Sequence, residues 1–505
     1  MAISISKTKI NIKSLLAFVT ILIVNFLLRI PATANGFFAF AYDQGRDVLQ
    51  ASSIIYGHNL TLIGPTTGLP GIFYGAYWYY LLAAVLAVSH GDPQIIGTLF
   101  GWFGVLTVCA IYFYLRSTLK SLLLTFCLTL AVSMSALWMF RPTVIWSTSI
   151  VPILMIGYLY ILNRIQKNSS RLNFFLLGLV SWATLDFEFP WGIVMILFTL
   201  SLPIFSKRFF LKKQYLFTLL GFLVMISPRI LFNIRNQFLE LNTFLAYIKL
   251  PKIYGIETNL LQRFFYRLDL FLDNFSQAFT NSNKILGILV IELFLLAIFL
   301  LIKFDKSNWK KLKNDFILRC SALLTLFSFI LFTFYKDTVW DYYLIGLPIT
   351  VLIMISRILN YTTLSEKYAK AVAWLAIIVL LILNFNQQIF RPFSFTWLGD
   401  GGTYRTQKAV MDYIAAEKPH NYTIYAYSPS IFDYPFDYLI SWYTSSGKIE
   451  KPQTYSRLFY MIVREANSDR YLKIGWYGDK TRDRTKVLER KYFPGNIMLE
   501  KHERY

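Results

Sequence analysis

Residues 14–30 read SLLAFVTILIVNFLLRI, and residues 39–47, which follow closely, read AFAYDQGRD. The first stretch is predominantly apolar and long enough to span a bilayer as a helix, since about 20 helical residues (range roughly 17–25) span the hydrocarbon core. The second stretch brings Asp43, Arg46 and Asp47 together within five residues. Ionisable side chains beside a bilayer are costly and usually functional. We therefore expect the chemical centre of the protein in the loop after the first apolar segment.

The first 34 residues also fit a second interpretation. A basic start, an apolar run and the sequence Ala32-Thr33-Ala34 together resemble a cleaved signal peptide. We favour a retained first helix, because the charged loop after it has to be held near the membrane. Sequencing of the mature N-terminus distinguishes the two, since cleavage gives a chain that starts at Asn35.

Composition places the chain among polytopic membrane proteins. Of its 505 residues, 56% are hydrophobic and 15% are charged, and the mean hydropathy is +0.48. Soluble domains carry about 25% charged residues. We predict an all-α membrane protein with about eleven transmembrane helices, at residues 14–30, 94–115, 121–138, 145–163, 172–186, 189–205, 214–229, 284–302, 316–334, 342–356 and 371–387.

The net charge of +22 is distributed in relation to the same segments: its basic residues lie mainly in the loops between them. Lys and Arg gather in the short loops after every even-numbered apolar segment, as in residues 303–313. This pattern is the positive-inside rule, and it argues against nucleic acid as a partner. It predicts a cytoplasmic N-terminus in a cell membrane. With an odd number of spans, the C-terminal part is then extracytoplasmic.

These boundaries predict two domains. Residues 1–387 form a transmembrane catalytic domain, whose loop one (31–93) carries the active site and an interfacial helix near 77–89. A second outer loop, 230–283, contains an amphipathic stretch near Leu260–Phe275. Residues 388–505 mix aromatic runs with turn signals and are long enough for a small extracytoplasmic α+β domain.

Several familiar sites are missing from the sequence. It has no phosphate loop, no H-E-x-x-H and no G-x-S-x-G, and its four histidines are scattered. Its three cysteines lie within apolar stretches, so neither a disulfide framework nor a cysteine metal site is expected. We predict no cofactor and no metal.

Asp43 has two interpretations. An Asp before a helical run often caps its free N–H groups. Alternatively, the carboxylate is a general base that takes a proton from an attacking hydroxyl. Asp47, four residues later, assists it or pairs with Arg46.

Three arginines lie where the positive-inside rule disfavours them, at the outer ends of spans: Arg141, Arg229 and Arg235. Each is either an interfacial anchor or a guanidinium fork that binds a phosphate. Glu292, inside an apolar run, is a relay residue or a structural acid. Asp186, Glu188, Asp337 and Asp341 fit caps or solvated turns better than catalysis.

The loop-one residues also carry a resemblance. Tyr42 to Asp47, then Gly64-Pro65-Thr66, Gly71-Ile72-Phe73-Tyr74-Gly75 and Gly91-Asp92-Pro93 resemble bacterial and archaeal members of glycosyltransferase family 39. That family belongs to the GT-C superfamily, with the protein O-mannosyltransferases and the aminoarabinose transferases. The likeness is strong over the first hundred residues and diffuse to about residue 440.

The resemblance implies an outward-facing active site, a polyprenyl-phosphate-sugar donor and transfer with inversion. It maps the catalytic base to Asp43. Two departures bear on this: Gln44 stands where many relatives have Glu, and Gly71 to Tyr74 replace a second acidic residue.

The sequence therefore favours a membrane glycosyltransferase acting on an extracytoplasmic glycan, lipid or protein. Asp43 is its base, and the expected substrate-binding residues are Tyr42, Arg46, Asp47, Tyr74, Arg141, Arg229 and Arg235. The alternative is a polytopic transporter or lipid flippase without transferase activity, for which Glu292 is the one candidate and no inverted repeat is visible. A receptor that binds through the C-terminal domain is a second rival.

Overall fold

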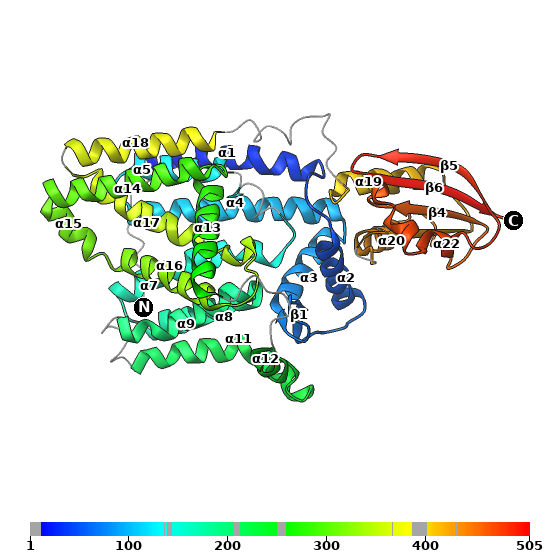
Figure 1. Cartoon of the computed structure of the whole chain (residues 1–505), viewed down its shortest axis with the longest axis horizontal. Helices are drawn as coiled ribbons and strands as arrows, with labels where there is room; N and C mark the ends of the chain where they lie inside the picture. The colour runs from blue at the N-terminus through cyan, green and yellow to red at the C-terminus, as the bar shows by residue number, and fades with distance from the viewer. Residues whose placement is uncertain are drawn as a thin grey trace.

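Long apolar helices lie roughly parallel and form the larger part of the molecule, and a small sheet domain extends from one end (Figure 1). The structure is a computed structural model that describes residues 12–135, 137–138, 144–205, 213–249, 259–365, 367–385, 401–429 and 432–505. Arg141 lies outside the described residues.

Eight helices in the described part of the chain are long and apolar enough to cross a bilayer. Five of them are single helices: α1 (Ile12–Ala34), α4 (Pro93–Thr118), α14 (Lys284–Phe304), α16 (Phe316–Phe334) and α18 (Lys367–Asn384). The other three each join a 3-10 turn to a helix: Ser147–Lys167 with α7 (Val151–Lys167), Lys213–Arg235 with α11 (Leu216–Arg235), and Asp341–Thr362 with α17 (Leu347–Thr362). Short 3-10 turns precede α7 (Ser147–Ile150), α11 (Lys213–Tyr215) and α17 (Asp341–Leu344).

Shorter helices complete the bundle: α3 (Tyr77–Ser89), α5 (Leu122–Met134), α8 (Arg171–Phe187) and α9 (Phe189–Phe205). Each of the eleven segments predicted as spans coincides with a helix of the bundle. How many of them cross the bilayer stays a prediction.

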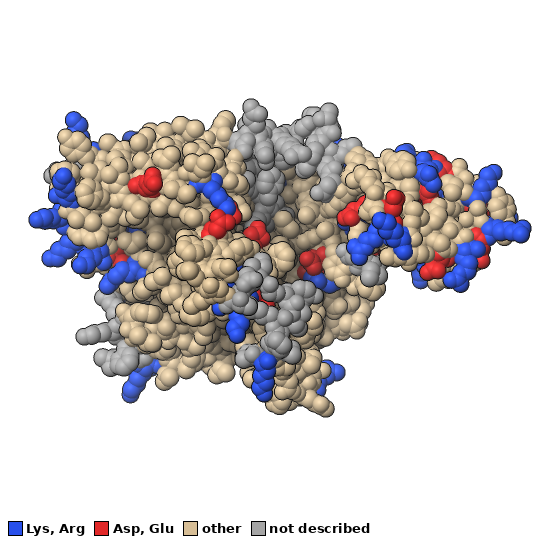
Figure 2. Space-filling view, viewed as in Figure 1, with Lys and Arg blue, Asp and Glu red and all other residues tan. Residues whose placement is uncertain are grey.

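The two ends of the bundle differ in charge. The short helix α15 (Lys306–Lys313) lies at the end away from the sheet domain, where Figure 2 shows Lys and Arg side chains gathered. The other end carries α2 (Tyr42–Tyr56), α3 and the hairpin of β1 (Ile63–Thr66) and β2 (Phe73–Gly75). Loop one therefore sits at the end of the bundle opposite this basic cluster, and which end faces the cytoplasm stays a prediction.

The second long loop forms α12 (Leu239–Lys249) and α13 (Leu260–Phe279). Helix α13 runs across the direction of the bundle (Figure 1) and covers the predicted amphipathic stretch. Its Arg267 donates to the carbonyls of Phe332 (3.1 Å) and Asp337 (2.7 Å). It thereby satisfies the Phe332 carbonyl in the last turn of α16, which the helix itself leaves without a partner, and the Asp337 carbonyl in the loop that follows.

The C-terminal domain is α+β, as predicted. Its four strands are ordered β3-β4-β6-β5, with β3 (Tyr422–Tyr427) parallel to β4 (Leu458–Val463) and the other pairs antiparallel. Strand β6 (Ile497–Arg504) is largely buried, whereas β5 (Thr485–Phe493) is an exposed edge strand. The domain's helices are α19 (Tyr404–Ala416), α20 (Tyr434–Ser445), α21 (Arg470–Lys473) and α22 (Trp476–Lys480).

Backbone hydrogen bonds dock this domain onto loop one. The Phe40 N–H donates to the carbonyl of Gly402 (2.7 Å), and the Tyr404 N–H donates to that of Phe38 (3.1 Å). The Tyr438 hydroxyl donates to the carbonyl of Gly91 (2.6 Å). The residues that lead into α2 are therefore held by the C-terminal domain.

Candidate active site

Helix α2 begins immediately before the predicted base. Ala41 occupies the N-cap position, and its N–H donates to Oε1 of Gln44 (3.0 Å). This is one half of a capping box, in which a Glu or Gln side chain at the third helical position accepts a hydrogen bond from the N-cap N–H. Gln44 can therefore fill the capping position that Glu occupies in many relatives. Asp43 is therefore not the N-cap. It lies in the first turn, where the helix dipole favours a carboxylate, and 46% of its side chain is exposed.

Arg46 connects the two carboxylates of α2. Its Nη1 lies 3.0 Å from Oδ1 of Asp43, and its Nη2 lies 2.8 Å from Oδ1 of Asp47. The Asp47 side chain is only 1% exposed, and Nε1 of Trp78 donates to its Oδ2 (2.7 Å). Both oxygens of Asp47 are thus occupied, so Asp47 orients Arg46, and Arg46 in turn holds Asp43.

Burial controls the ionisation of Asp47. It raises the pKa of the carboxyl to about 6, although Arg46 and the Trp78 N–H favour the ionised form. The two carboxylates of α2 thus sit in different environments, one half-exposed and one enclosed. Of these two carboxylates, Asp43 is the one that a molecule in solution can reach.

Tyr74 marks the centre of a second group of polar residues. Burial raises the pKa of its phenol well above the usual range, and the nearby Glu188, Tyr342 and Tyr343 act in the same direction, with a smaller effect from Asp43. Glu188 is buried at the junction of α8 and α9. Residues from loop one, the α8–α9 junction and the turn before α17 therefore converge on the region that Asp43 borders.

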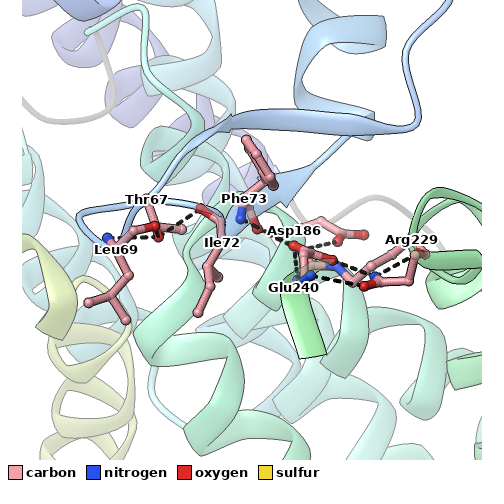
Figure 3. Close-up of polar contacts among 8 residues, drawn as sticks. Thr67, Leu69, Ile72, Phe73, Asp186, Arg229 and Glu240 are labelled. Atoms are coloured by element: carbon pink, nitrogen blue, oxygen red, sulfur yellow. Dashed lines mark hydrogen bonds and ion pairs between the residues drawn. The ribbon is translucent and has the colours of Figure 1, made fainter. Parts of the chain in front are cut away.

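Figure 3 shows how the hairpin that carries Tyr74 is held. Nη2 of Arg229 donates to the Phe73 carbonyl (2.8 Å), and the Phe73 N–H donates to Oε1 of Glu240 (3.2 Å). Arg229 and Glu240 also pair with each other (3.3 Å), and Nδ2 of Asn233 donates to Oε2 of Glu240 (2.8 Å). We call Arg229, Asn233 and Glu240 the Phe73 clamp.

The parts of the hairpin before and after Phe73 also make close contacts. The Thr67 hydroxyl donates to the carbonyls of Leu69 (3.2 Å) and Ile72 (2.9 Å), which closes the turn (Figure 3). A Cβ on Gly75 would lie 2.0 Å from Oδ1 of Asp186, so only glycine allows β2 to approach α8 this closely. Both neighbours of Tyr74 are therefore tightly held, Phe73 by the clamp and Gly75 by its close approach to α8.

The clamp gives a prediction about loop one. In Glu240→Ala, Arg229 loses its nearest carboxylate and the Phe73 N–H loses its acceptor, and leaving a buried polar group without its partner costs about 1–3 kcal/mol. We expect faster amide exchange of the β1–β2 hairpin, measured by hydrogen–deuterium exchange mass spectrometry.

The matched control is Glu503→Ala. Glu503 pairs with Arg457 (3.1 Å), whose side chain is 73% exposed, and exposed ion pairs contribute little. Hairpin exchange should stay unchanged in that variant. Equal exchange in wild type and Glu240→Ala would show that the clamp does not hold the hairpin.

The predicted phosphate-binding arginines have different surroundings. Arg229 is engaged in the clamp, and its Nη2 also lies 3.9 Å from Oδ1 of Asp186. Arg235 ends α11 at the same end of the bundle as loop one, is exposed, and has no hydrogen-bonding or ionic partner among the described residues. Arg235 is therefore the more available cation.

The C-terminal domain contributes aromatic side chains beside α2. The rings of Tyr42 and Tyr434 lie 4.8 Å apart, and Phe432 stacks on Tyr434 at 5.7 Å. Arg46 lies 5.9 Å from the ring centre of Tyr42. An aromatic surface built from both domains thus lies next to the Asp43–Arg46 pair.

Sequence reasoning missed several of these residues. Glu188 was interpreted as a cap or turn residue, Tyr342 as the first residue of the span 342–356, and Glu240 was passed over, because the partners of these residues lie far away in the chain. The aromatic residues of the sequence Asp341-Tyr342-Tyr343-Leu344 were the available signal. Among the described residues, no group of three or more His, Cys, Asp or Glu side chains is arranged to hold a metal ion.

The fold is GT-C-like: a helical bundle, a loop with short helices at one end of the bundle, and a C-terminal domain. The chain is similar to ArnT from Cupriavidus metallidurans bound to undecaprenyl phosphate, at 11% identity and a TM-score of 0.57, over 96% of this chain and 97% of that one. For ArnT in the apo state, identity is 12% and the TM-score 0.56, with the same coverage.

At such low identity this likeness establishes the fold, and the GT-C fold expected from the sequence is confirmed. No family model matches the chain. No curated protein matches it either. Membership of family 39 stays a prediction.

Proposed function

We propose that the protein is a membrane glycosyltransferase that transfers a sugar from a polyprenyl-phosphate donor to an extracytoplasmic acceptor. The observation that carries the proposal is the half-exposed Asp43, held by Arg46 beside the buried polar group around Tyr74. The fold supports it, because a protein with this fold has been crystallised with undecaprenyl phosphate.

In the proposed reaction Asp43 accepts the proton of the acceptor hydroxyl, whose oxygen attacks the anomeric carbon of the sugar. The bond from that carbon to the phosphate oxygen breaks, and the lipid phosphate leaves with the bonding electrons. Attack opposite the leaving group inverts the anomeric configuration. No step requires a nucleotide, a metal or another cofactor.

The developing phosphate charge needs a cation. We assign this role to Arg235, because Arg229 is committed to the Phe73 clamp. Arg141 remains a further candidate. Tyr42 and Tyr74 would line the sugar, and the C-terminal domain would select the acceptor through Tyr434. Loop one and the C-terminal domain would face the extracytoplasmic side, with the N-terminus in the cytoplasm.

The test compares cells with and without the gene. We expect deletion to accumulate one polyprenyl-phosphate-linked sugar and to remove one sugar from a cell-surface glycoconjugate, both detected by mass spectrometry. Complementation with the wild-type chain should restore the glycoconjugate.

The transporter alternative predicts a different result. Purified protein in proteoliposomes would then move a labelled lipid between leaflets, while the lipid-linked sugars would remain unprocessed even after reaching the outer leaflet. Glu292, its candidate residue, lies on the exposed surface of α14, which gives that alternative no structural support.

A further inference from the structure

The short helix α15 carries a concentration of positive charge at the end of the bundle away from the sheet domain (Figure 1), where Figure 2 shows basic side chains on the surface. Residues 303–313, which include the end of α14 and the whole of α15, contain five lysines and one aspartate. The side chains of all five lysines are exposed. We call these lysines the α15 lysine patch: Lys303, Lys306, Lys310, Lys311 and Lys313.

Packing fixes the side on which α15 presents its lysines. Leu312 is buried against residues of α14 and α17, and Trp309 is partly buried in the same cluster. Lys306, Lys310 and Lys313 recur every three or four residues and therefore share one face of the helix. The helix is thus held to the bundle by its apolar side chains, while this basic face stays in contact with the surroundings.

The two aspartates of this region are engaged elsewhere. Asp305 caps α15, because its carboxylate accepts hydrogen bonds from the N–H (2.9 Å) and the side-chain amide (2.8 Å) of Asn308. The carboxylate of Asp315 accepts hydrogen bonds from Nε of Arg357 (2.8 Å) and from the hydroxyl of Tyr361 (3.1 Å). The fold therefore uses these acids for a helix cap and a buried ion pair, and the lysine patch keeps its excess of positive charge.

The patch lies at the depth of lipid headgroups. Helix α14 has 21 residues, which at 1.5 Å of rise per residue gives about 31 Å, close to the thickness of a hydrocarbon core. Helix α15 follows it directly. Beside it, the exposed rings of Phe304 and Tyr368 have centres 5.9 Å apart, and Nζ of Lys303 lies 5.2 Å from the Phe304 ring centre. Aromatic rings and lysines are typical of the interface between bilayer and water.

We propose that the α15 lysine patch binds the phosphate groups of acidic phospholipids in the leaflet where α15 lies. The lysine ammonium is a compact charge with three hydrogen-bond donors, which suits a phosphate diester. Clusters of about four to eight basic residues directly after a membrane span are attracted to anionic lipids. The depth of the patch and its aromatic neighbours favour a lipid over a soluble acidic protein. The inference is independent of the proposed function.

The experiment uses the full chain in detergent and measures lipid affinity by native mass spectrometry. The probes are phosphatidylglycerol, which is anionic, and phosphatidylethanolamine, which has no net charge. We expect wild type to bind phosphatidylglycerol at least about tenfold more tightly. The variant Lys306→Gln/Lys310→Gln/Lys313→Gln should bind it at least about tenfold more weakly than wild type, since each lysine near an anionic surface contributes roughly fivefold. Its affinity for phosphatidylethanolamine should stay the same.

Two further variants separate the patch from the charge of the whole chain. Arginine at the same three positions keeps the charge, and affinity for phosphatidylglycerol should stay within about threefold of wild type. The variant Lys451→Gln/Lys473→Gln/Lys486→Gln removes the same amount of charge from exposed positions of the C-terminal domain. It should bind phosphatidylglycerol as tightly as wild type.

Hydrogen–deuterium exchange locates the contact. The full chain is placed in nanodiscs of phosphatidylglycerol or of phosphatidylcholine, which has no net charge. We expect the amides of residues 303–313 to exchange more slowly in phosphatidylglycerol, and this difference should disappear when the three lysines of α15 are glutamine. Exchange of the C-terminal sheet should be the same in both lipids.

Four results would overturn the proposal. The first is a wild-type chain that binds the two probe lipids equally well. The second is a patch glutamine variant that keeps the wild-type affinity for phosphatidylglycerol. The third is an equal loss of affinity in the C-terminal control variant. The fourth is a patch that binds polyglutamate, a soluble acidic polypeptide, and not phosphatidylglycerol.

Discussion

Asp43→Asn should lower sugar transfer by two to four orders of magnitude, the usual contribution of a general base. The asparagine side chain has the same shape, but it cannot accept the hydroxyl proton. Folding should survive, because Asp43 is half-exposed and its pairing with Arg46 is the surface part of the network. The measurement is restoration of the glycoconjugate in deletion cells, with the amount of protein in the membrane determined in parallel.

A suitable control removes an exposed, ion-paired acid elsewhere. Asp479 pairs with Arg482 (3.2 Å), and both side chains are more than half exposed. Asp479→Asn should transfer sugar at the wild-type rate. If Asp43→Asn also retained full transfer, the assignment of the base would be wrong, and Glu188 would become the next carboxylate to replace.

Gly45→Ala should separate the C-terminal domain from α2. A Cβ on Gly45 would lie 2.4 Å from the nitrogen of Pro435 and 2.6 Å from the carbonyl carbon of Tyr434. These are backbone atoms, so no change of rotamer relieves the contact. Overpacking of this kind typically costs 1–3 kcal/mol, which outweighs the gain of about 0.5–1 kcal/mol from alanine in a helix. We expect a lower midpoint of thermal unfolding in detergent and a large loss of transfer, because Tyr434 moves away from Tyr42.

Gly157→Ala provides the matched comparison. Gly157 also lies within a helix, α7, and a Cβ there would meet no atom within 4 Å. That variant should be as stable as wild type or slightly more stable. Equal unfolding midpoints and equal activities for the two variants would show that the seam between α2 and α20 tolerates expansion.

The candidate site was predictable where its parts are close in sequence. Asp43, Arg46 and Asp47 lie within one helical turn or so, and the ion pairs among them follow from that spacing. The role of Asp47 did not follow, because Trp78, which occupies its second oxygen, is contributed by another helix. Arg229 was assigned to the donor phosphate from its position alone. The structure places it against Glu240 and Phe73.

The sequence by itself determined the helical bundle and the small C-terminal domain with strands, and it placed loop one at the end of the bundle away from the basic loops. Runs of apolar residues fix helices in a bilayer, since every backbone polar group there must be satisfied within the helix, and the distribution of lysine and arginine distinguishes the two ends. Only the tertiary structure decided which carboxylate of α2 is accessible, which arginine is available and how the C-terminal domain meets α2. Those outcomes depend on contacts between distant segments, such as the hydrogen bond from the Phe40 N–H to the Gly402 carbonyl. Nearly every residue carries the same backbone N–H and C=O groups, so the sequence does not single out this pair.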